Sequence, residues 1–149
     1  MSQESTIKQH GESLQRSITL PNDIATISQL SEFVETVCEE KGLDMALTMN
    51  LNLALEEAVV NVMSYAYPDS QGDVKVDIMI DDQKVVSTLT DSGIPFDPTL
   101  RERADTTLSA EDRQSGGLGI LLVRELMDAI NYERDNGQNI LTLIKNINA

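Results

Sequence analysis

Two polar residues, Glu57 and Asn61, interrupt an otherwise apolar stretch of the chain. A spacing of four residues places both side chains on one face of a helix. Burying a carboxylate and an amide costs free energy unless each finds a partner, and a metal ion or a ligand supplies one. A polar stripe toward solvent that also includes Asn50 and Ser64 explains the same pattern. Because this spacing is common by chance, the pair alone favours the solvent stripe.

A second group of reactive residue types is the segment 91–98, Asp-Ser-Gly-Ile-Pro-Phe-Asp-Pro, at the end of an expected strand. Asp91 can accept a hydrogen bond from an exocyclic amine, and Gly93 lets a flat ring approach the backbone closely. The same residue types also form ordinary tight turns. A ring-binding pocket and a simple turn therefore explain this segment about equally well.

The third group is the segment 115–119, Ser-Gly-Gly-Leu-Gly, which leads directly into an expected helix. The backbone N–H groups around Gly116, Gly117 and Gly119, together with the positive end of the helix dipole, make phosphate a natural ligand. A flexible loop before a helix is the simpler interpretation of so short a motif. The pattern matches neither the P-loop nor the dinucleotide-binding fingerprint, so both of those folds are disfavoured.

Composition narrows the classes of partner. The 149 residues include 11 Lys and Arg against 25 Asp and Glu, a net charge of -14. Such a surface repels phosphate backbones and anionic lipids, so we expect no direct nucleic-acid or membrane partner. Cys38 is the only cysteine, which excludes an intrachain disulfide and fits a reducing compartment. Because the chain has one histidine, His10, we expect no His/Cys metal site. We see neither a long apolar run nor a signal segment, so we predict a cytoplasmic protein.

Periodicity predicts the elements that must position these groups. Segment 1–15 is polar and 16–149 forms one domain, in which the polar stretch at about 99–115 is a mobile lid. The expected strands are 16–20, 74–80, 84–90, 130–134 and 140–145, and the expected helices are 24–41, 45–65 and a third that starts at 116 and includes Ala129. This order predicts an α+β fold, a two-layer sandwich whose mixed, mostly antiparallel sheet carries the helices on one face.

Taken together and in this order, the three groups resemble the GHKL ATPase superfamily. The closest resemblance is to the bacterial anti-sigma-factor serine/threonine protein kinases of the stress-response and sporulation type, and it extends from about Arg16 to Lys145. It implies a histidine-kinase-like ATPase fold, Mg-ATP as the ligand, an antagonist protein as phosphoacceptor, a sequestered sigma factor and a homodimer.

The resemblance also implies roles for individual residues. Asn61 would coordinate Mg²⁺, Glu57 would be the general base, and Asp91 would bind the adenine amine, with Gly93 lining the ring pocket. The phosphates would be cradled by Gly116, Gly117 and Gly119, and charge alone suggests lid arginines as further contacts: Arg101, Arg103 and Arg113.

One position departs from the family pattern. Tyr65 stands four residues after Asn61, where these kinases typically carry a histidine. A tyrosine is not cationic near neutral pH, although its hydroxyl can still form hydrogen bonds. The alternative function is therefore a non-catalytic, ATP-sensing regulatory module that binds a sigma factor or response protein. A histidine-kinase catalytic domain or a gyrase-type ATPase is disfavoured, because dimerisation helices with a phosphoacceptor histidine, or transducer domains, are missing.

Overall fold

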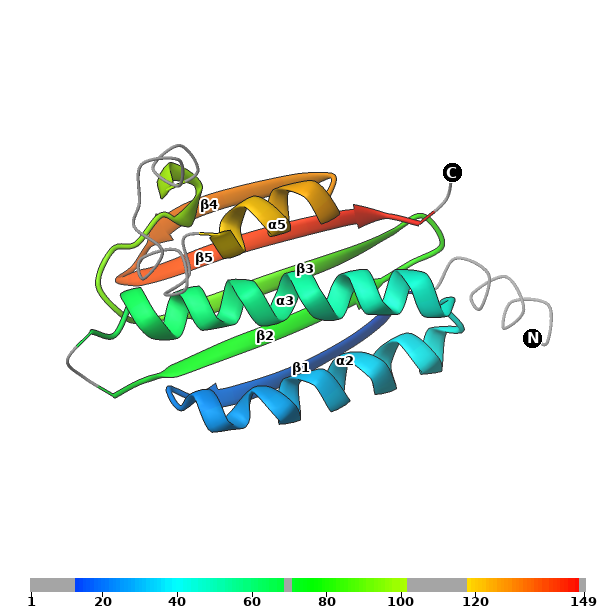
Figure 1. Cartoon of the computed structure of the whole chain (residues 1–149), viewed down its shortest axis with the longest axis horizontal. Coiled ribbons are helices and arrows are strands. Elements are labelled where there is room, and N and C mark those ends of the chain that lie inside the picture. Colours follow the sequence, from blue (N-terminus) through cyan, green and yellow to red (C-terminus); the bar gives the residue numbers. More distant parts are fainter. Residues whose placement is uncertain (1–12, 69–70, 102–117, 148–149) are drawn as a thin grey trace.

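The computed structural model describes residues 13–68, 71–101 and 118–147, with the side chains of 101 and 118–120 left undescribed. Five strands form one sheet in the order β1-β2-β3-β5-β4, and helices α2, α3 and α5 lie side by side across it (Figure 1). The bounds are β1 Leu14–Pro21, η1 Ile24–Thr26, α2 Ile27–Lys41, α3 Met45–Tyr65, β2 Asp73–Ile80, β3 Lys84–Asp91, η2 Pro98–Arg101, α5 Leu118–Leu126, β4 Ala129–Asp135 and β5 Gln138–Asn146.

Strand pairing in the described sheet is antiparallel throughout, so the prediction of mostly antiparallel strands is confirmed and the expected mixed pairing is wrong for these residues. The β2–β3 turn is held by Asp81, whose carboxylate accepts hydrogen bonds from the N–H groups of Gln83 and Lys84, each at 2.8 Å. The β4–β5 turn places Asn136 and Gly137 at φ 55° and 77°, the conformation that a two-residue Asn-Gly hairpin loop requires. Local turn chemistry thus fixes both hairpins.

Caps fix the ends of the two long helices. Gly42 ends α2 in the left-handed region at φ 76°, and its N–H donates back to the carbonyl of Glu39. Asp44 then starts α3, because its carboxylate accepts the N–H of Leu47 at 2.8 Å. Both boundaries agree with the sequence-based expectation.

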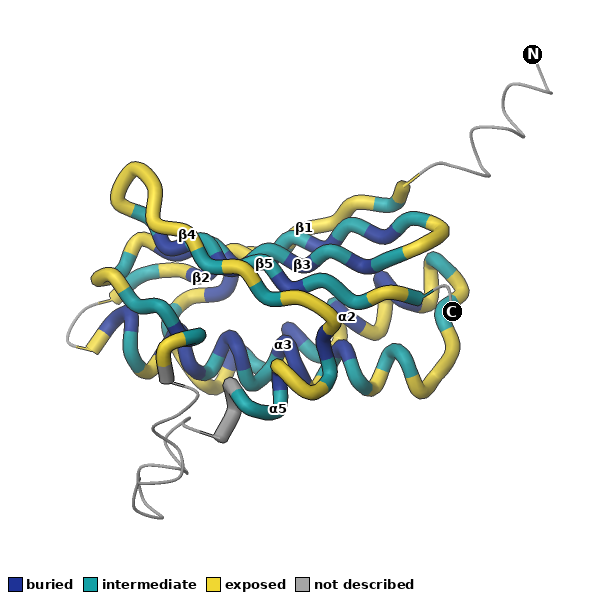
Figure 2. The backbone as a smooth tube through the Cα atoms, turned by 90° about the horizontal axis from the view of Figure 1, so that it is seen from above, coloured by how far each residue is buried: buried dark blue, intermediate teal, exposed yellow. Residues whose placement is uncertain are grey.

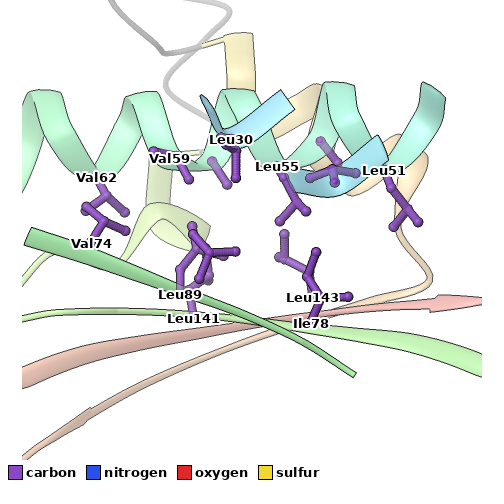
Figure 3. Packing of buried hydrophobic residues seen from close by; sticks show 14 of the residues in the cluster. Leu30, Leu51, Leu55, Val59, Val62, Val74, Ile78, Leu89, Leu141 and Leu143 are labelled. Atoms are coloured by element: carbon purple, nitrogen blue, oxygen red, sulfur yellow. The ribbon is translucent and has the colours of Figure 1, made fainter. Parts of the chain in front are cut away.

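The helices and the sheet share one apolar core. Leu51, Leu55, Val59 and Val62 point from α3 toward the sheet, where side chains of β2, β3 and β5 meet them (Figure 3). These inward positions alternate along each strand, as expected for a sheet with one covered face. Figure 2 shows the described helices on one side of the sheet only. The α+β two-layer prediction is confirmed.

Several boundaries differ from expectation, and two of these differences have a clear cause in the hydrogen bonding. Strand β1 begins at Leu14 rather than at residue 16, because Leu14 and Gln15 continue the pairing with β2. Ala129 was expected on the last helix but begins β4. The reason is at Asp128, whose N–H donates to the carbonyl of Ile144 and whose carboxylate accepts the N–H of Asn146, so the chain already pairs with β5 there. No described helix is long and apolar enough to cross a membrane.

Candidate functional site

Helix α3 lies between α2 and α5, so its residues are covered on more than one side (Figure 1). Asn61 is only 1% exposed, which makes the solvent-stripe interpretation wrong for this residue, whereas Glu57 is half-buried and Ser64 is exposed. The Asn61 Nδ2 group donates to the backbone carbonyl of Glu57 at 2.9 Å. Its Oδ1 is buried and has no hydrogen-bond partner in the described part of the chain.

This unpaired amide oxygen suits a hard cation. A buried acceptor without a donor costs free energy in the free protein, and Mg²⁺ prefers oxygen ligands of this kind. Among residues 13–68, 71–101 and 118–147, no group of three or more His, Cys, Asp or Glu side chains could hold a metal ion. Asn61 therefore fits a magnesium ion whose remaining ligands come from elsewhere, as happens when nucleotide phosphates share the ion.

Asp91, the last residue of β3, forms the second part of the site. It is 3% exposed, and its Oδ1 accepts both the N–H of Gly93 at 2.9 Å and the Nδ2 group of Asn139 at 2.8 Å. Burial raises the pKa of the Asp91 carboxyl, while the hydrogen bonds and the charge of Arg134 partly offset this. The carboxylate is thus held in one orientation by Oδ1, and its other oxygen can accept an additional donor.

The segment after Asp91 is attached to the end of α3. Ile94 N–H donates to the carbonyl of Ala66 at 2.9 Å, and the hydroxyl of Tyr67 accepts the N–H of Ser92 at 2.8 Å. A Cβ on Gly93 would lie 2.2 Å from the Ala66 oxygen, so only glycine permits this approach. Gly93 is therefore needed for the packing of the loop on α3, whatever else it lines.

Asn139 makes hydrogen bonds along the 91–96 segment and was not predicted from the sequence. It is 3% exposed, and its Nδ2 donates to Asp91 and also to the carbonyl of Ile94, at 2.8 Å each. Its Oδ1 accepts the N–H of Phe96 and side-chain donors of Tyr132 and Arg134. The available signal was its place on β5, where it occupies an inward position in step with Leu141 and Leu143.

Tyr65, four residues after Asn61 on α3, faces the same segment. Its ring stacks on that of Phe96, with centroids 5.3 Å apart and planes 24° from parallel. Phe96 is held in turn by Asn139. Tyr65 is therefore part of the packing between the end of α3 and the 91–96 segment.

Of the predicted site residues, Glu57 and Asn61 share a face of α3, and Asp91 and Gly93 lie on the segment fastened to the end of that helix. Gly119 lies in the first turn of α5, the helix that packs beside α3. The other predicted phosphate contacts lie outside the described residues or side chains: Gly116, Gly117, Arg101, Arg103 and Arg113. Most of the expected lid, 102–115, is also outside them.

Comparison with known proteins identifies the family of the chain. Residues 20–145 match the family model described as a histidine kinase-like ATPase domain. The chain is similar to the serine/threonine-protein kinase BtrW of Bordetella bronchiseptica, with 33% identity over 98 residues, covering 65% of this chain and 69% of BtrW. It is also similar to the serine-protein kinase RsbW of Listeria monocytogenes, with 27% identity over 110 residues, covering 70% of each chain.

Two solved structures share the fold. One contains the RsbU and RsbW domains of a Mycobacterium tuberculosis protein, with a TM-score of 0.64 and 18% identity; the match covers 89% of this chain but only 32% of that longer one. The other is the SiaB–SiaC complex of Pseudomonas aeruginosa, with a TM-score of 0.56, 15% identity and coverage of 98% and 96%. With a family model that spans most of its length, the chain belongs to the histidine kinase-like ATPase domain family.

Proposed function

We propose that this protein is an ATP-dependent anti-sigma-factor kinase, which binds Mg-ATP, phosphorylates a serine or threonine of an antagonist protein, and sequesters a sigma factor in the cytoplasm. The observation that carries the proposal is the buried, unpaired amide oxygen of Asn61 on the same face of α3 as Glu57. Curated relatives that are named serine or serine/threonine kinases support the reaction class.

In this proposal the protein supplies position more than reactivity. Asn61 Oδ1 would hold Mg²⁺, which neutralises charge on the phosphate oxygens when it is bound. Asp91 would accept a hydrogen bond from the adenine amine, in the orientation that Asn139 and the Gly93 N–H already fix. Gly116, Gly117 and Gly119 would present backbone N–H groups to the phosphates at the start of α5.

Glu57 would act on the acceptor hydroxyl. The hydroxyl oxygen of the antagonist's serine or threonine bonds to the γ-phosphorus, the bond from that phosphorus to the bridging oxygen of ADP breaks, and the hydroxyl proton passes to Glu57. A carboxylate placed for this role typically contributes about 10²- to 10⁴-fold to the rate. Glu57 is half-buried, so its carboxylate remains within reach of a docked partner.

A non-catalytic, ATP-sensing regulator is the second candidate, and Tyr65 is the observation that favours it. Its ring packs on Phe96 instead of offering a cationic side chain near the site. In that case nucleotide binding alone would switch the affinity for a sigma factor or a response protein. The two candidates share the nucleotide site and differ in whether Glu57 is needed.

The first experiment is titration calorimetry of ATP with and without Mg²⁺, on the wild type, Asn61→Ala and Asn50→Ala. We expect Mg-dependent binding that Asn61→Ala abolishes and Asn50→Ala keeps, because Asn50 lies on the same helix and its amide is not among the buried atoms without a partner. No binding by the wild type at millimolar ATP would contradict the nucleotide site.

A second experiment separates the two candidates. Glu57→Gln should keep Mg-ATP binding and lower phosphoryl transfer to a cognate antagonist about 10²-fold or more, measured by intact-protein mass. If the wild type binds Mg-ATP but transfers nothing, and Glu57→Gln still exchanges partners normally, the protein is the sensor and not the kinase.

A further inference from the structure

A groove runs along the outer side of the helix layer, between α2 and α3, the two helices that lie side by side in Figure 1. Its volume is about 530 Å³. Its apolar lining comes from the α2–α3 turn and from one stripe of α3, namely Leu43, Met45, Met49 and Leu53. Glu57, Asn61 and Asp91 are not among its lining residues, so the groove is separate from the site described above.

The apolar lining is unusually open to solvent. Met45 is 80% exposed, Met49 58% and Leu53 43%, at a spacing of four residues along one face of α3. Single exposed apolar residues are common, but an aligned apolar strip inside a groove is typical of a binding surface. Methionine is also flexible and polarisable, which suits a surface that adapts to a partner.

Carboxylates stand on both walls of this groove. Glu35 and Glu39 come from α2 and are exposed, and Glu56 comes from α3. Among the described residues that line the groove there is no Lys or Arg. The groove therefore combines an apolar floor with acidic edges, which is the complement of an apolar ridge flanked by basic residues.

The length of the groove matches a short helix. Its α3 side runs from Met45 to Glu56, a rise of about 16 Å at 1.5 Å per residue, or three helical turns. An amphipathic helix of that length presents apolar anchors at positions i, i+3 or i+4, and i+7, which is how helices occupy such grooves.

Outside the described residues, the sequence of this chain offers no net basic segment that would complement the groove. Segment 1–12 carries Lys8 against Glu4 and Glu12, and segment 102–117 carries two arginines against four acidic residues. A second copy that docked by the same face would bring its three glutamates against these three. Charge complementarity thus points to another protein.

We propose that the α2–α3 groove docks an amphipathic helix of a partner protein, with its apolar ridge on Met45, Met49 and Leu53 and its Lys or Arg residues beside Glu35, Glu39 and Glu56. The docking needs no nucleotide. The groove nevertheless ends one residue from the proposed base, since Glu56 lines it and precedes Glu57. Burial and, to a smaller extent, the charge of Glu57 raise the pKa of the Glu56 carboxyl, while a hydrogen bond with Ser31 partly offsets this. A partner in the groove is therefore placed to report on, or to alter, the face of α3 that carries Glu57.

The test uses a synthetic helical peptide of about 18 residues with a leucine ridge flanked by lysines, and a twin in which glutamates replace the lysines. Binding is measured by fluorescence anisotropy without nucleotide, and amide chemical shifts map the contact. We expect the basic peptide to bind and to shift resonances of α2 and α3. Met49→Glu should weaken it about tenfold by placing a charge on the apolar floor, and Glu39→Lys about threefold.

Glu133→Lys is the matched control, because it makes the same charge change at an exposed position on β4. Glu39→Lys should also improve binding of the acidic twin, whereas Glu133→Lys should change neither peptide. Equal binding of both peptides, equal weakening by Glu39→Lys and Glu133→Lys, or shifts confined to other elements would each overturn the proposal. So would a wild-type dimer in sedimentation that Met49→Glu dissociates, because a second copy would then occupy the groove. None of these outcomes depends on ATP binding, so the nucleotide proposal stands or falls separately.

Discussion

Two buried asparagines at the candidate site, Asn139 and Asn61, differ in how fully their side-chain amides are hydrogen-bonded. Asn139 uses both ends of its amide and makes hydrogen bonds to five residues, whereas Asn61 makes one and leaves its amide oxygen without a partner in the described residues. The first arrangement is complete in the free protein and fixes the Asp91 end of the site. The second leaves a buried acceptor without a donor among the described residues of the free protein. The difference indicates that the proposed adenine end is preorganised, while the proposed phosphate end depends on its ligand.

Removing the complete network should have the largest effect. Asn139→Ala leaves the Phe96 N–H, the Ile94 carbonyl and the Tyr132 hydroxyl without their buried partner. We expect a loss of about 3 kcal/mol in the free energy of unfolding, measured in urea. Asn131→Ala on the exposed face of β4 is the control and should change stability by less than about 0.5 kcal/mol. Equal effects of the two variants would mean that the network is not a stabilising unit.

Replacing Asn61, whose amide oxygen has no partner among the described residues, should raise the free energy of unfolding instead of lowering it. Asn61→Leu removes the unpaired oxygen and adds apolar volume of similar size, so we expect the free protein to gain about 1 kcal/mol while Mg-dependent ATP binding is lost. Ser87→Ala is the matched control, since the Ser87 hydroxyl is also buried without a partner among the described residues but lies in the middle of β3. It should leave ATP binding unchanged. If Asn61→Leu binds Mg-ATP like the wild type, the unpaired oxygen is not a ligand.

Most of the fold could be predicted from capping and turn residues in the sequence, but the difference in hydrogen bonding between Asn61 and Asn139 could not. The Asp44 cap, the Gly42 stop and the Asn136-Gly137 turn set their own boundaries through neighbouring residues, so a single sequence indicates them. Asn61 was harder, because local periodicity shows a polar stripe but not that α2 and α5 cover α3 on both sides.

Asn139 could not be predicted from spacing at all. Its contact with Asp91 joins residues 48 apart, and it exists because the register of β3 and β5 sets the two opposite each other. Register depends on the whole sheet, so no short motif contains it. A polar residue at an inward strand position was the one hint that the sequence held.

The pH dependence of stability tests the environment of Asp91, at the proposed adenine end of the site. Because burial raises its pKa, the folded state favours the protonated form; that contribution is complete below the unfolded pKa and is lost as pH rises through the folded pKa. Asp91→Asn keeps an oxygen for the Asn139 and Gly93 donors and cannot ionise. We expect it to match the wild type in acid and to exceed it by about 1 kcal/mol near neutral pH, in urea unfolding from pH 3.5 to 7.5, while ATP binding is lost.

Asp81 has a pKa shift of the opposite sign, so its contribution to stability should change with pH in the opposite direction. Two backbone N–H groups lower the pKa of this exposed carboxyl, so its contribution is present above the unfolded pKa and is lost as pH falls through the folded pKa. Asp81→Asn should therefore be less stable than the wild type near neutral pH and approach it in acid. If the stability difference from the wild type changed with pH in the same way for Asp91→Asn and Asp81→Asn, the burial of Asp91 would not be the cause of its pH dependence.

The smallest expected effect concerns the joint between the two ends, where the ring of Tyr65 on α3 stacks on Phe96 of the 91–96 segment. Tyr65→Phe keeps the ring and Tyr65→Leu removes it, so the difference between these two variants isolates the stack from any contribution of the hydroxyl. Combined with Phe96→Leu in a double-mutant cycle, the pair should show a coupling of about 0.5 kcal/mol in urea unfolding, because both rings are only half-buried. A coupling near zero would mean that the rings are neighbours without mutual stabilisation, and that the hydrogen bonds of Ala66 and Tyr67 alone fasten the 91–96 segment to α3.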